Sequence, residues 1–585
     1  MQVFGHGSQM MTSAYIPWAL WAVDRLIEKF SWRHLALVGL SLGFQLLCGH
    51  VQIAYYSLMM VGLYVLFHLV HFIIQKHYNR LLPTLGGIAG ALILAGALSA
   101  VLFLLLQEYT PFSIRGSPSV LQTAAGTKDT GVGFEYATQW SFSPGEMMTF
   151  IIPSFYGFGG QPFYWGNMPF TDYPNYMGIL VLGFAIAAFV LYLPKSGPNR
   201  LLVMFLGTTI LLALLLSYGY HFAFFYKLFY NYLPYFNKFR VPVMILILVQ
   251  CAVAILAGLG LEGILSRLRT TDTATKDEIA ARSRISRRLW IALAALAAVV
   301  LLLTILRGSF LDFMRSVYPD QYEPNYQEPL DKARFDMLFR DIWIVFFVAA
   351  GGITMLALTA APKISATTAG VVICLISLAD LWLVDKKIGK TYPQTESANI
   401  LKPDAITQFL RADSTLYRIY PTGQLFGEVR WSGQEFQSVG GYHAAKPRLY
   451  QDFIEAMGLQ GTALPAPHVI DMLNAKYIIT FESLVDTNFA VRQQFQTGNG
   501  VLRIYENRAV LPRAHLVGEY IVEADPIAAL TRLRTGPEAN GKGFDPHHQV
   551  LLNEEPELKP QPDAAAAQIT QYDFHAVTIS TQSSS

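Results

Sequence analysis

The stretch "VPVMILILVQCAVAILAGLGLEGI" (Val241–Ile264) is apolar throughout, except for Gln250 and Glu262. A helix needs about 20 mostly apolar residues to cross the hydrocarbon core of a bilayer. This stretch is long enough, so it predicts a membrane-spanning helix. The whole chain of 585 residues has a similar character, with 53% hydrophobic and 14% charged residues and a mean hydropathy of +0.34. The composition therefore indicates a membrane protein.

The same apolar pattern recurs on both sides of this stretch, up to Val384. A shorter run, Ser13–Ala22, carries Pro17 and is either part of a further span or a cytoplasmic tail. Together these runs predict a polytopic α-helical membrane bundle of about ten spans over residues 1–384. The other runs are Trp32–Cys48, Ile53–Ile74, Thr84–Leu106, Tyr176–Leu193, Leu201–Tyr218, Leu289–Leu306, Ile342–Ala360 and Ser365–Val384.

Basic residues gather in alternate connections between these runs. If the spans alternate in direction, the basic connections all lie on one side, which the positive-inside rule identifies as cytoplasmic. They are Asp24–Arg33, Gln75–Arg80, Lys195–Arg200 and Ser266–Arg288. The opposite, outer side then receives the Gly49–Gln52 hairpin, long loops at 107–175, 219–240 and 307–341, and everything after Val384.

The sequence pattern changes after Lys386, where the long apolar runs end. Short alternating segments, "LYRIYPT", "AKYIITF" and "GVLRIYEN", lie between turn signals and predict strands. Helices are expected at Pro447–Met457 and His468–Asn474. Residues 385–585 are thus predicted to form an extracytoplasmic α+β domain. Because the chain stops in "HAVTISTQSSS", within another strand-like region, we expect this domain to be incomplete.

Several function classes are disfavoured by composition. The net charge of +2 gives no argument for a nucleic-acid partner. The three cysteines, Cys48, Cys251 and Cys374, fall in apolar runs, so no disulfide framework is expected. No metal-ligand spacing of Cys and His occurs, and no cofactor is identified, although a divalent metal remains open.

Five stretches, in family order, resemble the YfhO family of large multi-pass bacterial membrane proteins. They are "QLLCGHVQIAYYSL" (Gln45–Leu58), "SPGEMMTFIIPSFYGFGG…YWGNMPF" (Ser143–Phe170), "FNKFRVP" (Phe236–Pro242), "SVGGYHAAKPRLYQDF" (Ser438–Phe453) and "VIDMLNAKYII" (Val469–Ile479). The resemblance implies a glycosyltransferase-C type protein of the bacterial cytoplasmic membrane. Such a protein takes a polyprenyl-phosphate-linked sugar as donor and glycosylates a cell-envelope glycopolymer on the outer face.

The chain departs from that family pattern at its start. The family usually carries an acidic catalytic residue in its first outer loop, whereas this chain opens at "FGHGSQMMTSAYIPW", which resembles a point several spans further on. That acid is therefore not carried over. We expect the chain to be a truncated form, which argues against activity of this fragment by itself.

Sugar transfer from a lipid phosphate needs a base, a positive charge on the leaving phosphate and a pocket for the sugar. Asp172 and Glu146, in the longest outer loop, are the candidate catalytic carboxylates. Tyr164 and Trp165 are candidates for stacking on sugars. The alternatives are that the carboxylates are solvated or cap helices, and that the aromatic residues belong to the interfacial belt.

Arg240 and Lys238, in "FNKFRVP", are the candidate donor-phosphate ligands. A guanidinium binds phosphate through two parallel hydrogen bonds, and a helix starting at Val241 would add free N–H groups. The alternative is that both side chains merely reach for the interface from a helix end.

The remaining candidates are polar residues at the outer side. His50 and Gln52 in the tight hairpin either contact substrate or satisfy the turn. Tyr442 and His443, with Lys446 and Arg448 nearby, either line an acceptor groove or belong to a turn packed on the outer domain. Asp380, inside the last span, is expected to face the bundle because a carboxylate in lipid needs a partner.

The resemblance thus implies a membrane glycosyltransferase, and two alternatives stay open. A non-catalytic assembly or scaffold protein fits the missing acidic loop. A lipid or polysaccharide transporter would need ionisable residues near mid-bilayer in several spans, and the sequence has almost none.

Overall fold

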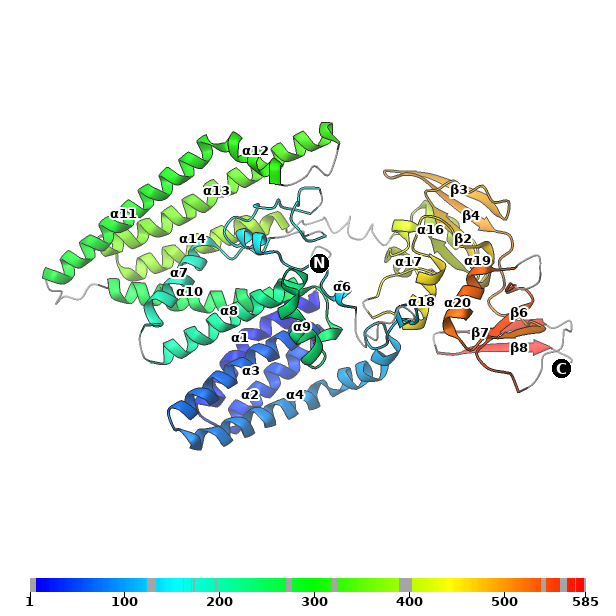
Figure 1. Cartoon of the computed structure of the whole chain (residues 1–585), viewed down its shortest axis with the longest axis horizontal. Helices are drawn as coiled ribbons and strands as arrows, with labels where there is room; N and C mark the ends of the chain where they lie inside the picture. Colours follow the sequence, from blue (N-terminus) through cyan, green and yellow to red (C-terminus); the bar gives the residue numbers. More distant parts are fainter. Residues whose placement is uncertain are drawn as a thin grey trace. The chain divides into compact units, whose positions relative to one another are not determined.

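The computed structural model of the chain (Figure 1) forms two compact units. It describes residues 7–123, 133–160, 162–169, 171, 174–194, 197–269, 276–317, 323–388, 402–443, 445–537, 543–557, 566–573 and 575–582. The first unit, here the helical unit, comprises residues 1–106 and 133–391; the second, the mixed unit, comprises residues 107–132 and 392–585.

The helical unit is built almost entirely of helices. In chain order these are α1 (Gly7–Glu28), α2 (Trp32–Leu47), α3 (Val51–Ile74), α4 (Leu81–Tyr109), α6 (Phe134–Ala137), α7 (Ile179–Tyr192), α8 (Pro198–Ser217), α9 (Ala223–Tyr232), α10 (Leu246–Leu268), α11 (Lys276–Ile305), α12 (Arg307–Val317), α13 (Pro324–Ala360) and α14 (Ala366–Ile388). Short 3₁₀ turns include η3 (Pro144–Phe150), η4 (Gly219–Phe222), η5 (Phe236–Lys238) and η6 (Pro242–Ile245).

In the described part of the chain, seven helical stretches are long and apolar enough to cross a membrane, which supports the membrane character of the unit. They contain α3, α4, α8, α10, α11, α13 and α14. The apolar α7, with 14 residues, and α2, with 16, are shorter. The predicted total of about ten spans therefore remains a prediction.

The helices differ in how far protein covers them. Half of the apolar window of α10 is buried, against 6% of that of α11 and 17% of that of α4. The long apolar faces of α11 and α4 are those that lipid would solvate. α10 lies close to α7 because Gly260 has no side chain: a Cβ there would come within 1.8 Å of the carbonyl oxygen of Phe184.

The basic connections meet at one end of the helices, here the basic end. Arg282 Nη2 donates to the carbonyl oxygens of Leu268, at 2.6 Å, and Thr359, at 3.1 Å, which joins the ends of α10 and α13. Arg80 Nη2 donates to the carbonyl oxygen of Glu28 at 2.7 Å, which joins the ends of α1 and α4.

The opposite helix ends form what we term the aromatic end. There the N–H of Phe142 donates to the carbonyl oxygen of Ser217 at 2.8 Å, at the end of α8. Tyr55 Oη, in the first turn of α3, donates to the carbonyl oxygen of Pro234 at 2.7 Å. The predicted long loop 307–341 differs from expectation: α12 and the first part of α13 occupy it, because Phe335 and Phe339 pack on Phe310.

The mixed unit centres on a four-stranded sheet with the order β1-β2-β4-β3. Its strands are β1 (Arg418–Pro421), β2 (Ala475–Thr480), β3 (Phe489–Thr497) and β4 (Gly500–Asn507); β1 is parallel to β2, and the other pairs are antiparallel. The predicted strands and helices are confirmed. The other elements are α5 (Val120–Thr123), α16 (Ala405–Arg411), α17 (Arg430–Gly433), α18 (Arg448–Met457), α19 (Pro467–Met472), α20 (Pro526–Thr535) and the strand pairs β5 (Glu519–Val522)–β6 (Gln549–Leu552) and β7 (Ala566–Tyr572)–β8 (Val577–Gln582).

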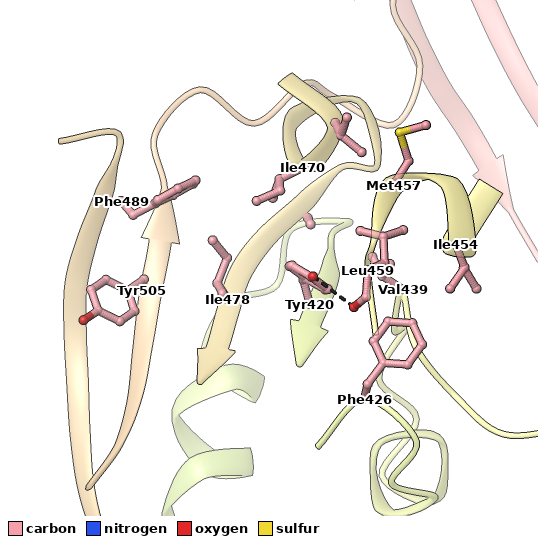
Figure 2. Close-up of a cluster of buried hydrophobic side chains, with 12 residues drawn as sticks. Tyr420, Phe426, Val439, Ile454, Met457, Leu459, Ile470, Ile478, Phe489 and Tyr505 are labelled. Atoms are coloured by element: carbon pink, nitrogen blue, oxygen red, sulfur yellow. Dashed lines mark hydrogen bonds between the residues drawn. The ribbon is translucent and has the colours of Figure 1, made fainter. Parts of the chain in front are cut away.

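Both faces of the central sheet are buried along β2, whereas residues 491–494 of the edge strand β3 are exposed. Along β2, Ile478 points into one core and its neighbours Tyr477 and Ile479 into the other, as the two-residue period of a strand requires. Figure 2 shows the first core, where Tyr420 Oη donates to the carbonyl oxygen of Leu459 at 3.0 Å.

The boundary of this unit differs from the predicted one. The prediction began it at residue 385, whereas the unit also includes residues 107–132, which follow α4. The reason is a set of long-range hydrogen bonds described below, which a reading of local patterns does not reveal.

Candidate functional site

Arg240 lies at the aromatic end on a platform of two rings. Its guanidinium carbon is 4.6 Å from the centre of the Tyr136 ring and 5.4 Å from that of Trp140. Nη1 also donates to Tyr136 Oη. Among the described residues, no carboxylate lies within ion-pair distance of this half-buried cation. Cation–π contacts therefore offset part of its desolvation.

The backbone around Arg240 is held firmly. Gln52 Nε2 donates to the carbonyl oxygen of Arg240 at 2.6 Å and to Tyr56 Oη at 2.9 Å. The next residue, Val241, has φ 62°, and Trp140 has φ 58°. A β-branched side chain in this region is strained, and such strain persists only where the surroundings impose it. Gln52 thus fixes the backbone from which the guanidinium extends, a structural role other than the turn contact that the sequence suggested.

The helix start contributes less than the sequence indicated. The helical backbone begins at Pro242, as the 3₁₀ turn η6, and not at Val241. The N–H of Val243 donates to the carbonyl oxygen of Trp140 at 3.4 Å, and that of Met244 to Val241 at 3.1 Å. Because these N–H groups already have acceptors, the expectation that they are free to attract an anion is wrong.

The two other candidates at this end have different surroundings. Lys238 lies in η5, and burial lowers the pKa of its ammonium group. His50 is the N-cap of α3, where its Nδ1 accepts from the N–H of Ile53 at 3.3 Å. This geometry matches the structural alternative for His50, namely satisfying the turn.

Glu146 is a capping residue and is buried. Its Oε2 accepts from the N–H of Ser143 at 2.8 Å, while Ser143 Oγ accepts from the N–H of Glu146, which forms a capping box on η3. Its Oε1 accepts from Tyr164 Oη. Burial, together with the Glu146 charge, raises the pKa of the Tyr164 hydroxyl. The carboxylate is thus engaged on both oxygens, as the helix-cap alternative expected.

The space beside Glu146 is too small for a sugar. The cavity that Glu146, Tyr164 and Phe142 line has a volume of about 10 Å³, room for about one water molecule. Tyr164 is buried, and the Trp165 ring packs at a tilt of 54° against Tyr156, with ring centres 5.1 Å apart. Tyr164 therefore offers no open face for stacking on a sugar, whereas Trp165 is only partly buried, and its predicted stacking role stays a prediction. The other candidate carboxylate, Asp172, lies outside the described residues.

Two buried carboxylates lie nearby in the helical unit. Asp380 accepts from Tyr176 Oη at 2.8 and 3.0 Å, which confirms that it faces the bundle. Asp341, which the sequence reading missed, accepts from Ser154 Oγ and pairs with Lys387 Nζ at 3.2 Å. Asp341 lies directly before a predicted span, where polar residues are common, so its position gave no sign of a special role. The only sequence feature that could have pointed to the ion pair was Lys387, just after the following predicted span.

The motif at 442–452 belongs to the mixed unit. Tyr442 and His443 are exposed, as a binding role requires, and Lys446 Nζ lies 6.0 Å from the Tyr442 ring centre. Arg448 instead holds the chain: its Nε donates to the carbonyl oxygen of Ser117 at 3.0 Å and its Nη2 to that of Ile114 at 3.1 Å. Arg448 therefore has the structural role that was the alternative.

Groups of three or more His, Cys, Asp or Glu side chains suited to a metal ion are not found within the ranges described above. The arrangement best suited to a ligand is the aromatic platform around Arg240. No family model, no curated protein and no solved structure matches this chain.

Proposed function

We propose that this protein binds the phosphate of a polyprenyl-phosphate-linked sugar at Arg240 and transfers the sugar to a cell-envelope glycopolymer. The observation that carries the proposal is the guanidinium of Arg240 on Tyr136 and Trp140, with no carboxylate partner among the described residues. The resemblance to the YfhO family supplies the donor and acceptor classes.

The chemistry of Arg240 favours a phosphate. A half-buried cation is stabilised by an anion that replaces its lost hydration. Within the described residues, the hydrogen bonds of the guanidinium use only Nη1, toward Tyr136. The other N–H groups suit the two parallel hydrogen bonds of a phosphate. In the transfer step, the acceptor hydroxyl would displace this phosphate from the sugar, and Arg240 would stabilise the negative charge that the phosphate gains.

The proposed orientation follows from charge. We assign the basic end, with Arg80 and Arg282, to the cytoplasm of a bacterial cell and the aromatic end to the outer face. Three spans, α11, α13 and α14, separate the basic connection Ser266–Arg288 from the mixed unit. Because three is an odd number of crossings, the mixed unit is then extracytoplasmic. A donor lipid would present its phosphate at the level of Arg240.

A second candidate, a non-catalytic assembly protein, is favoured by Glu146. Its carboxylate is engaged by the capping box and Tyr164, so it is not available as the base that sugar transfer requires. Such a protein would still bind the lipid phosphate at Arg240 but would not turn it over.

Binding to the intact chain in lipid nanodiscs tests the proposal, with a polyprenyl monophosphate as the probe and the uncharged polyprenol as the control lipid. Hydrogen bonds to a charged group contribute about 1.5–3 kcal/mol each, so Arg240→Ala should weaken binding of the phosphate about tenfold or more. Arg240→Lys should restore only part of it, because lysine keeps the charge and loses the fork.

Arg284→Ala is the matched control, since Arg284 is an exposed arginine at the basic end. Equal binding of the phosphate by wild type and all three variants, at equal thermal stability, would overturn the proposal. Sugar transfer to a polymer acceptor then separates the two candidates: a protein that binds the donor without transferring its sugar is an assembly protein.

A further inference from the structure

The helix α9 has two aromatic faces that point in opposite directions. Tyr226 and Tyr230 are buried. Phe224, Leu228 and Tyr232 are exposed by 75%, 43% and 81%. Residues four apart lie above one another on a helix, so these three form one continuous stripe. Water is an unfavourable environment for such a stripe, and its aromatic composition is typical of a membrane interface.

The buried face fixes α9 to the aromatic end. The ring of Tyr226 lies 5.4 Å from that of Phe236 and 6.1 Å from that of Phe134. Phe236 in turn lies 6.5 Å from Tyr55, in the first turn of α3. The depth of α9 is thus set by contacts with the end of a membrane span.

The positions of the neighbouring spans in the chain place α9 at the same depth relative to the membrane. The span that contains α8 ends at Ser217, and only Tyr218 and η4 separate it from α9. The span that contains α10 begins at Pro242, shortly after α9 ends. A helix tied to three span ends lies at the level where the bilayer surface meets the protein.

We infer that α9 lies in the membrane interface and inserts its stripe of Phe224, Leu228 and Tyr232 among the lipid head groups and the adjoining acyl chains. The occupant of this face is lipid, because α9 is joined along the chain to the ends of α8 and α10 and packs through Phe236 on the start of α3, so the exposed stripe lies at the level where these spans meet the bilayer surface. Lys227, the one charged residue of the helix, is exposed beside the stripe, where a lipid phosphate suits it.

The buried face of α9 is also connected to Arg240 through ring contacts. The ring of Tyr230 lies 5.7 Å from that of Phe134, the first residue of α6. The same short helix carries Tyr136, on which the guanidinium of Arg240 rests. Contacts therefore run from the buried face of α9 through α6 to Arg240. The inference concerns α9 and lipid, so it stands whether or not Arg240 binds a lipid-linked sugar.

Nitroxide labels on the full chain in lipid nanodiscs test the inference. Single cysteines replace Leu228 or Tyr232 after Cys48, Cys251 and Cys374 are changed to serine. The readout is the accessibility of each label to oxygen, which enters lipid, relative to a water-soluble nickel chelate. Ile291, 59% exposed in the α11 span, is the lipid control; Val485, 95% exposed in the mixed unit, is the water control.

The oxygen-to-nickel ratio at both α9 positions should lie several-fold above that at Val485 and below that at Ile291. A ratio equal to that at Val485 would overturn the inference by placing the stripe in water. Protection from both reagents would also overturn it, because protein would then cover the stripe.

Wild-type protein provides a measurement that needs no variant. A phospholipid with a photoreactive group near its head should form adducts on the peptide that contains Phe224–Tyr232. Adducts confined to the neighbouring span ends, with none on this peptide, would contradict the inference.

Discussion

Arg448 and Asp452 face each other across one turn of α18, with Nη1 and Oδ1 3.4 Å apart, and together hold the segment that follows α4. Asp452 accepts from Ser119 Oγ at 2.7 Å and from the N–H of Val120 at 3.1 Å. A second connection joins the N–H of Ile114 to the carbonyl oxygen of Lys446, at 2.9 Å. The side chain of Asp452 is buried, so its hydrogen bonds to Ser119 and Val120 form out of contact with water.

Replacing Asp452 should therefore destabilise the mixed unit. Asp452→Ala removes the carboxylate that pairs with Nη1 of Arg448 and accepts from Ser119 Oγ and the N–H of Val120. Removal of one partner of a buried pair costs about 3–5 kcal/mol. Hydrogen–deuterium exchange of the full chain in detergent should show faster exchange at 113–123 and in α18. The control is Arg492→Ala, whose pair with Glu506 is largely exposed and contributes about 0–1 kcal/mol. Equal exchange in both variants would contradict the prediction.

Gly260→Ala should separate α7 from α10. The added Cβ would meet the carbonyl oxygen of Phe184 at 1.8 Å, so the two backbones must move apart. Overpacking of this kind costs about 1–3 kcal/mol, and we expect a lower melting temperature of the purified protein. Gly258→Ala in the same helix is the control, because nothing lies within 4 Å of its Cβ position. Alanine also favours helix there, so this variant should melt at or slightly above the wild-type temperature.

Glu146→Gln separates a capping role from a catalytic one. Glutamine keeps the volume but weakens the bonds to the N–H of Ser143 and to Tyr164 Oη, because it carries no charge. The expected result is a loss of stability of about 1–3 kcal/mol, measured by thermal unfolding. Tyr164→Phe should also lower the stability, since it removes one of these two contacts, the hydrogen bond to Glu146. Loss of sugar transfer at unchanged stability would instead identify Glu146 as the base.

Because of Asp413, the free energy of unfolding of the mixed unit should fall at acidic pH. Burial alone would raise its pKa, but hydrogen bonds from Lys476, Thr415 and Tyr477 outweigh burial and lower the pKa well below its ordinary value. A lowered folded-state pKa means that Asp413 contributes stability above its unfolded pKa, about 3.9, and loses it as the pH falls toward the folded value.

Unfolding of the full chain, followed by exchange in β1 and β2, should therefore become easier below about pH 4. Asp413→Asn should be less stable at neutral pH and should lose this part of the acid dependence. The same acid dependence in wild type and variant would assign it to other carboxylates.

Local patterns in the sequence were enough to predict most of the elements. An apolar run marks the part of a helix that lipid would solvate, and this part was predicted well. For example, α3 begins two residues before the predicted Ile53 and ends at the predicted Ile74. An apolar run does not reveal the polar part of a helix that extends beyond it. For example, α13 begins at Pro324, well before the predicted Ile342. Its polar first part is held by packing, which leaves no apolar run.

The site was predictable only in part, for a related reason. Position and charge pointed to Arg240, but Tyr136, which accepts its hydrogen bond, is 104 residues away. No short-range pattern connects the two. Glu146 shows the opposite case, since "SPGE" is a visible capping box and its acidic residue needed no catalytic explanation.

The contacts of Arg448 and Asp452 with the segment after α4 have a consequence for biosynthesis. Ser119 and Asp452 are 333 residues apart in the chain, so one emerges from the ribosome long before the other. At about 5–20 residues per second, the delay amounts to some tens of seconds. During this interval the segment after α4 has no partner, while the spans that follow it are inserted one after another. The mixed unit therefore completes its fold only late in translation, after the spans between its two segments have been synthesised.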